Sequence, residues 1–222
     1  MNKYVIHFSK KGYIKYTSHL DMLRLFKRAF KKTGISLVHS QGFNPHPKMG
    51  FAQPLSLGYT SSCEFLEFET QEVQDEREMA EKLSAAMPEG IEIHSCSPFD
   101  MNVKSLAAAT VEAEYTVTFP VKTDEKDYQE ILCSYLNQSE ILAEKRQKKT
   151  KKMVASDIRP KIRSMEILHN FPELTLNMRL DCGSASNLSP EQVIASFIKF
   201  ADMNVQRFDI DVERKKLFFD KI

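Results

Sequence analysis

Two histidines lie in short stretches whose neighbouring side chains are also suited to chemistry. His19 belongs to SHLD at residues 18–21, and His46 belongs to SQGFNPHPK at residues 40–48. Metal-free RNA cleavage needs a base for the 2′-hydroxyl and an acid or cation for the leaving oxygen, and histidine suits the first task at neutral pH. His19 and His46 are therefore the candidate catalytic residues, with Lys48 as an alternative cation for the second task.

The SQGFNPHPK stretch is predicted to be an irregular loop whose side chains suit the recognition of RNA. Gly42 and two prolines exclude a regular helix or strand there. An aromatic ring can stack on an unpaired base and amides can bond base edges, as in proteins that read single strands. The candidates are Gln41, Phe43 and Asn44, with Lys48 for a phosphate. Two alternatives stay open: Phe43 fills the core, or Asn44 only ends a turn.

A helix is expected between Ser18 and Gly34. The Ser18 hydroxyl can cap the free N–H groups, Asp21 stands three residues later as in a capping box, and glycine favours the left-handed end of a helix. Its packed face is predicted from helical spacing to hold Leu20, Leu23, Phe26 or Lys27, and Phe30. Its exposed face is predicted to hold a stripe of cations that bind phosphates, Arg24, Lys27, Arg28 and Lys31.

Charge is unevenly divided along the 222 residues, although the formal net charge is only +1. Residues 1–62 hold ten Lys and Arg against one acid, residues 63–140 hold five against eighteen, and residues 141–222 hold sixteen against eleven. Large basic clusters favour a polyanionic partner, because each neutralised phosphate releases counterions. The alternative is a pair of solvated surfaces that only keep the protein soluble.

A second basic cluster lies in EKRQKKTKK and is expected at the tip of a hairpin, where lysines follow a nucleic-acid backbone without reading its sequence. Its cations are Lys145, Arg146, Lys148, Lys149, Lys151 and Lys152. In the DIRP segment at residues 157–160, Arg159 either pairs with Asp157 or extends the RNA surface.

The expected order of elements is strand, helix, strand, strand, helix, strand, and it comes twice. In the first half, strands are expected at residues 3–8, 35–39, 63–70 and 91–97, and helices at 18–34 and 75–87. In the second half, strands are expected at residues 114–119, from residue 141 onward, at 173–180 and at 208–218. Helices are expected at 124–136 and 189–200. The predicted fold class is therefore α+β, with two tandem ferredoxin-like (βαββαβ) domains. Residues 1–98 form the first domain with the SQGFNPHPK loop inserted, residues 99–111 a linker, and residues 112–222 the second domain with the basic loop.

Composition disfavours several classes of protein and site. No apolar run approaches the ~20 residues of a membrane span, and the first residues lack a signal-peptide core, so a cytoplasmic location without membrane contact is expected. No metal site is expected, because His19 and Asp21 are two residues apart and cannot share a helical face. The cysteines lie far apart without a CxxC pair and are predicted to be buried thiols: Cys63, Cys96, Cys133 and Cys182.

Three motifs together carry a resemblance to a known family. SHLDMLRLFKRAFKKTG is followed by SQGFNPHPKMGFAQPLSLGYTSSCEFLEFE, and DIRP comes later. With these motifs the chain resembles the radical SAM-linked proteins, a domain of unknown function, over most of its length. The resemblance implies a protein fused to, or encoded beside, a radical S-adenosylmethionine (SAM) protein, often near a ribonuclease and ribosomal proteins. This chain has no CxxxCxxC run for an iron–sulfur cluster, so S-adenosylmethionine and the cluster are expected in the partner and no cofactor in this chain.

The expected function is that of an RNA-binding accessory protein, which acts with a radical SAM enzyme in the modification or maturation of tRNA or rRNA and is not a catalyst on its own. Two alternatives remain. One is a protein-interaction module that contacts the radical SAM partner without RNA, through the acidic residues 63–140 and the SQGFNPHPK loop. The other is a metal-independent endoribonuclease with His19 as its base.

Overall fold

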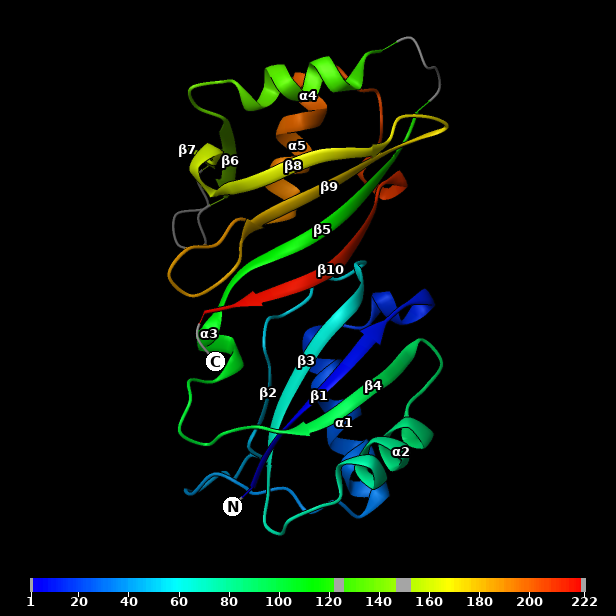
Figure 1. Cartoon of the computed structure of the whole chain (residues 1–222), viewed down its shortest axis with the longest axis vertical. Helices are drawn as coiled ribbons and strands as arrows, with labels where there is room; N and C mark the ends of the chain where they lie inside the picture. Colours follow the sequence, from blue (N-terminus) through cyan, green and yellow to red (C-terminus); the bar gives the residue numbers. More distant parts are fainter. Residues whose placement is uncertain (1, 122–125, 147–152, 221–222) are drawn as a thin grey trace. The chain divides into compact units, whose positions relative to one another are not determined.

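The computed structural model describes residues 2–121, 126–146 and 153–220, with the side chains of residues 145 and 146 left out (Figure 1). The chain divides into two compact units. Unit 1 is Met1–Thr110 together with Arg214–Ile222, and unit 2 is Val111–Glu213. Each unit combines antiparallel strands with helices, which confirms the α+β class. The finer assignment to two ferredoxin-like domains, with the bounds given above, stays a prediction.

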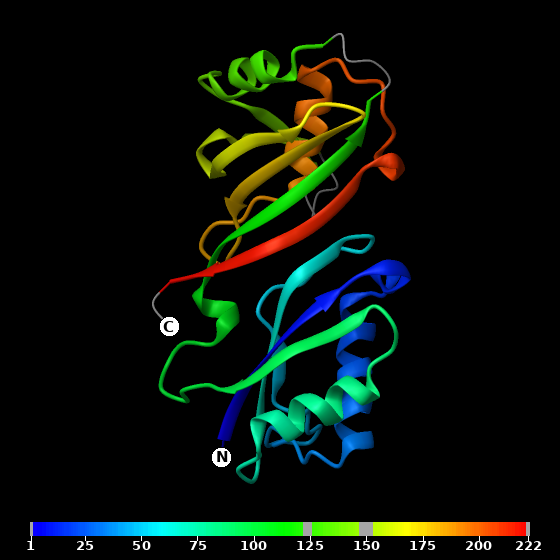
Figure 2. The same ribbon diagram turned by 45° about the vertical axis from the view of Figure 1, so that its right-hand side comes forward.

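Unit 1 is built around β4, β1 and β3, which lie side by side in that order (Figure 2). Its elements are β1 (Asn2–Lys10), η1 (Gly12–Tyr16), α1 (His19–Thr33), β2 (Met49–Phe51), β3 (Thr60–Thr70), α2 (Glu76–Ala86), β4 (Ile91–Pro98) and α3 (Leu106–Ala109). Strand β2 pairs antiparallel with β3 over three residues. The part of β10 (Asp211–Phe219) that belongs to unit 1 also lies next to β3.

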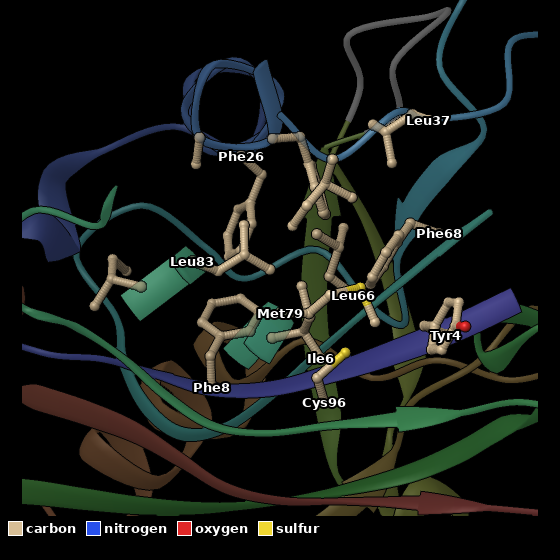
Figure 3. Close-up of a cluster of buried hydrophobic side chains, with 14 of the residues drawn as sticks. Tyr4, Ile6, Phe8, Phe26, Leu37, Leu66, Phe68, Met79, Leu83 and Cys96 are labelled. Carbon is tan, nitrogen blue, oxygen red and sulfur yellow. The ribbon is translucent and has the colours of Figure 1, made fainter. Parts of the chain in front are cut away.

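The core of unit 1 lies between this sheet and the two helices α1 and α2 (Figure 3). Alternate residues of a strand point to one face, and those of β1 that face the helices, Tyr4, Ile6 and Phe8, are all buried. Helix α1 contributes Phe26 and Phe30 to the same cluster, and helix α2 contributes Met79 and Leu83. Full burial of each large apolar side chain stabilises the fold by about 1.5–3 kcal/mol.

Helix α1 has the ends that the sequence predicts. The Ser18 Oγ accepts a hydrogen bond from the Asp21 N–H at 3.2 Å, and Gly34 ends the helix with a left-handed φ of 75°. The predicted packed face is wrong in one respect. Leu20 is 62% exposed, whereas Met22 is buried. The core face of α1 therefore follows Met22, Phe26, Ala29 and Phe30.

Unit 2 is built around β5, β9 and β8, in that order. Its elements are β5 (Thr110–Pro120), α4 (Tyr128–Leu136), β6 (Leu142–Arg146), β7 (Met153–Asp157), η2 (Arg159–Lys161), β8 (Ile162–His169), β9 (Glu173–Asp181), α5 (Pro190–Phe200) and η3 (Arg207–Asp209). Tyr135 of α4 packs edge-on against Phe197 of α5 and bonds the Ser196 hydroxyl at 2.6 Å. Strands β6 and β7 form a separate two-stranded sheet, which the six-element pattern does not contain.

One predicted strand is absent from the structure, and the expected linker contains a helix. Residues 35–39 are not a strand, since only isolated bridges occur there, between Leu37 and Thr70 and between His39 and Pro47. The expected linker at residues 99–111 contains the short helix α3.

The cysteine prediction holds for only two of the four thiols. Cys96 and Cys182 are buried, and burial raises the pKa of Cys96 to about 12. Cys63 is half-buried and Cys133 is exposed, because Cys133 lies on the outer face of α4.

A buried ion pair fastens the last strand of the chain to β3. Arg214 is 1% exposed and Glu64 is 4% exposed. The Arg214 Nε and Nη2 donate to the two Glu64 oxygens at 2.8 and 2.6 Å. The Nη2 and Nη1 groups also donate to the backbone oxygens of Gln53 at 3.0 Å and Pro54 at 3.3 Å, respectively. The pair thus also holds the segment that leads from β2 into β3.

We predict that Arg214→Met lowers the free energy of unfolding by about 3–5 kcal/mol, because it leaves the Glu64 carboxylate buried without a partner. The double variant Glu64→Leu with Arg214→Met should recover part of this loss, since no charge then remains buried. Urea unfolding of the whole chain, followed by circular dichroism, measures both. A loss below about 1 kcal/mol in the single variant would contradict this role for the pair.

Candidate nucleic-acid interface

The cationic stripe of helix α1 is exposed, as the sequence predicts. Arg24, Lys27, Arg28 and Lys31 all point away from the core. Arg24 is paired with Asp21 at 2.8 Å, and hydrogen bonds from Ser18 and Arg24 lower the pKa of Asp21. Arg28 also interacts electrostatically with Asp21, whereas among the described residues Lys27 and Lys31 form no salt bridge. Over the 15 residues of α1, the stripe follows a helix about 22 Å long.

The segment after α1 closes the SQGFNPHPK loop into a protruding tip. The Ser40 N–H donates to the His46 oxygen at 2.8 Å, and the His46 N–H donates to the Ser40 Oγ at 3.0 Å. Phe43, at the tip, is fully exposed, so the alternative that it fills the core is wrong. The other tip candidates, Gln41, Asn44 and His46, are exposed as well. Lys48 is paired with Glu69 at 2.9 Å.

A groove of about 420 Å³ lies between the last turns of α1 and the base of this loop. Its apolar lining is Phe30, Ile35, Leu37 and Pro47. Its polar lining is Lys27, Lys31, Ser36, His39 and Gln71. The volume falls in the range of small-molecule sites, which combine apolar walls with a few polar groups. Two of the predicted phosphate-binding lysines therefore belong to a concave site and not only to a flat surface.

The two candidate catalytic histidines are not brought together. His19 lies in the first turn of α1, whereas His46 belongs to the loop that leaves the other end of this helix. His19 contacts Phe51 edge-on, and burial lowers its pKa. Beside it lies a cavity of about 20 Å³, lined by Lys10, Gln53 and Glu64 among others. That volume holds about one water molecule, so a nucleotide does not fit there.

Lys10 is a buried residue that the sequence reading missed. It is 3% exposed, and its Nζ donates to the backbone oxygens of Thr17 at 2.9 Å and Lys15 at 3.3 Å. The alternation of β1 could have predicted this burial, because Lys10 lies on the same face of the strand as Tyr4, Ile6 and Phe8. The Lys10 ammonium therefore fixes the turn before α1 and is not available to a ligand in solution.

The second basic cluster is only partly within the described residues. Lys145 and Arg146 end β6, with their side chains outside the described part, and Lys148, Lys149, Lys151 and Lys152 lie outside it altogether. Arg159 is half-buried, and its Nε donates to the Leu136 oxygen at 2.9 Å. The Asp157 carboxylate accepts from the backbone N–H groups of Ile141 and Arg159. Asp157 and Arg159 of the DIRP segment thus stabilise unit 2.

The described residues contain neither a membrane-spanning helix nor a metal-binding cluster. No helix there is both long and apolar enough to cross a membrane. No group of three or more His, Cys, Asp and Glu side chains in the same residues is placed to hold a metal ion.

Residues 3–190 match the family described as "Uncharacterized protein conserved in bacteria (DUF2344)". The chain belongs to this family.

No curated protein matches the chain. Among solved structures, it is similar to a crystal structure of a Cbf5-Nop10-Gar1 complex, with a TM-score of 0.53 and 10% identity over 99% of this chain and 50% of that one. The chain thus spans about half the length of this neighbour, and the likeness concerns the fold alone. An unknown protein from Galdieria sulphuraria also matches, with 14% identity over 96% of this chain and 98% of that one and a TM-score of 0.27.

We predict that the His19 imidazole titrates at a lower pH in the folded chain than in the chain unfolded in urea, because burial disfavours its charged form. The unfolded state then binds the proton first, so His19 contributes a loss of stability as the pH falls below about 6.5. An NMR titration, with the signal assigned through His19→Gln, measures the two midpoints. A folded midpoint at or above the unfolded one would contradict the burial.

Proposed function

We propose that the chain is an RNA-binding accessory protein. The observation that carries the proposal is the exposed stripe of α1, which runs into a concave groove lined by Lys27 and Lys31. A flat array of cations binds any polyanion. A groove with apolar walls beside the cations also suits the base and sugar of a nucleotide.

The charge of α1 favours a polyanion over a solvated surface. Lys27 and Lys31 stand four residues apart, so their ammonium groups repel each other on the helix. Among the described residues no acid relieves this repulsion. A bound phosphate would relieve it, and each neutralised phosphate also releases counterions.

The partner in this proposal is a radical SAM enzyme, and the RNA is tRNA or rRNA. Both come from the family resemblance of the SHLD and SQGFNPHPK motifs and of DIRP. In this role the chain holds RNA while the partner carries S-adenosylmethionine and the iron–sulfur cluster. A ribonuclease activity is less well supported, because His19 and His46 lie toward opposite ends of α1 and the cavity beside His19 is too small for a nucleotide.

A second candidate function, a protein-interaction module, is favoured by one observation. Four apolar side chains are exposed near the start of α1: Tyr13 by 93%, Tyr16 by 63%, and Leu20 and Leu57 by 62% each. The Gly58 N–H donates to the Lys15 oxygen at 2.9 Å, so the segment with Leu57 lies beside η1. Exposed apolar groups that gather in this way mark protein-binding surfaces, and tyrosine is enriched in such interfaces.

The RNA proposal predicts a steep loss of affinity for a fluorescent tRNA pool as salt rises, because several phosphate contacts are screened. Arg24→Ala with Arg28→Ala should weaken binding and flatten the slope of log affinity against log salt, by about 0.7 for each contact to single-stranded RNA. Lys82→Ala is the control, since Lys82 is an exposed lysine of unit 1 on another helix, α2. No binding at low salt, or the same slope in the double variant, would count against the stripe. A denaturing gel of the same samples reports any cleavage.

The protein-interaction candidate predicts that the chain and its radical SAM partner elute together in size-exclusion chromatography without RNA. Tyr13→Ser with Leu57→Ser should weaken this association at least about tenfold, because it removes two of the exposed apolar side chains from the surface. Val73→Ser is the control, since Val73 is an apolar residue of unit 1 that is 78% exposed. Association that survives the double variant, or that Val73→Ser weakens equally, would contradict this surface.

A further inference from the structure

We infer that the groove between α1 and the loop binds one unpaired nucleotide of the RNA, with its base against the apolar lining and its phosphate on Lys27 and Lys31. This inference rests on the proposed function and adds the class of ligand that the groove selects. The groove is open to solvent and lies wholly within unit 1.

The lining suits a flat ring with polar edges. Phe30, Ile35 and Leu37 are buried residues whose edges form the groove wall, and they offer apolar contact without hydrogen bonds. An alkyl chain would use this wall but not the polar groups beside it. A nucleobase uses both, because its faces are apolar and its edge carries donors and acceptors.

The polar side of the groove presents both kinds of hydrogen-bonding group. The His39 Nδ1 lies 3.1 Å from the Leu37 oxygen, and this oxygen can only accept, so Nδ1 carries the proton. In the neutral ring Nε2 is then an acceptor. The Gln71 side chain is exposed and has an amide that both donates and accepts. These two groups can bond the edge of a base whose own edge is not occupied by pairing.

The phosphate would lie on the α1 side of the groove. Lys27 and Lys31 line it one helical turn apart, so their two ammonium groups can meet oxygens of the same phosphate. Inorganic phosphate alone would gain only these contacts. A nucleotide gains the wall and the polar edge as well and should bind more tightly.

The concave shape requires an unpaired base. A base within a duplex has both faces stacked and its pairing edge occupied, and taking it out of the helix costs a few kcal/mol. The exposed Phe43 at the loop tip adds a stacking surface for a second unpaired base. The site therefore favours loops, bulges and single strands over uniform duplex.

The first experiment compares the whole chain with its variants on a fluorescent single-stranded RNA and on the same strand annealed to its complement, at equal salt. Wild type should bind the single strand at least about tenfold more tightly. Gln71→Leu keeps the size of the side chain and removes its hydrogen bonds, and it should weaken single-strand binding about fivefold with no effect on the duplex. Lys82→Ala serves as the control, and unchanged urea midpoints show that the variants fold.

The second experiment uses the absence of tryptophan from the chain. Phe43→Trp introduces one tryptophan at the loop tip, which can be excited selectively over the seven tyrosines, and stacking on an unpaired base should quench its emission. Single-stranded RNA should quench this emission strongly, whereas duplex and inorganic phosphate should not. Adenosine, guanosine, cytidine and uridine 5′-monophosphates then report, by calorimetry, whether a single nucleotide suffices.

The outcomes separate the two levels of the proposal. Equal affinity for single strand and duplex, with Gln71→Leu like wild type, would overturn the nucleotide site and leave salt-dependent RNA binding by α1 in place. No binding of any RNA at low salt would overturn both. Weaker single-strand binding in Gln71→Leu, with quenching of the Phe43→Trp emission, would support the site.

Discussion

Unit 1 depends on the buried ion pair between Glu64 and Arg214. A carboxylate and a guanidinium removed from water cost several kcal/mol each, and only close geometry with all donors satisfied offsets this. Each nitrogen of the Arg214 guanidinium donates at least one hydrogen bond, to Glu64 or to the backbone oxygens of Gln53 and Pro54. The two charged partners are 150 residues apart in sequence, so the sheet that carries α1 is incomplete until the end of the chain is made. Experiments on the interface therefore need the whole chain.

Helix α1 serves two surfaces with opposite requirements. Its inner face supplies Met22, Phe26 and Phe30 to the core, and its outer face carries the cations. The groove arises where the two meet, because the chain after Gly34 does not continue as a strand. Ile35 and Leu37 fold inward beside Phe30, and the Val38 N–H is held by the Glu69 oxygen at 2.9 Å. Apolar walls thus come to lie next to Lys27 and Lys31 without any added element.

Local patterns explain what the sequence predicted well. Ser18 and Gly34 mark the ends of α1 because capping depends only on neighbouring residues, and the cationic stripe follows from the helical period alone. The sequence could not predict the groove. Gln71 and His39 are far apart in sequence and line it together only because an irregular segment folds against β3. The burial of Glu64 could have been predicted, because Glu64 shares a face of β3 with Leu66 and Phe68. Its partner Arg214 could not, because no residue near Glu64 in sequence indicates it.

The two proposed surfaces do not exclude each other. The exposed apolar side chain of Leu20 lies in the first turn of α1 and that of Tyr16 in the preceding η1, whereas the groove proposed for a nucleotide lies at the last turns of α1. The helix rises about 10–17 Å between Leu20 and the groove residues Lys27 and Lys31, which exceeds the Debye length of about 8 Å at physiological salt. A protein partner at one end would therefore perturb RNA at the other end mainly through direct contact with the RNA. Such a partner would receive an unpaired nucleotide at a fixed distance along α1, which is what an accessory protein must provide to an enzyme that acts on one base.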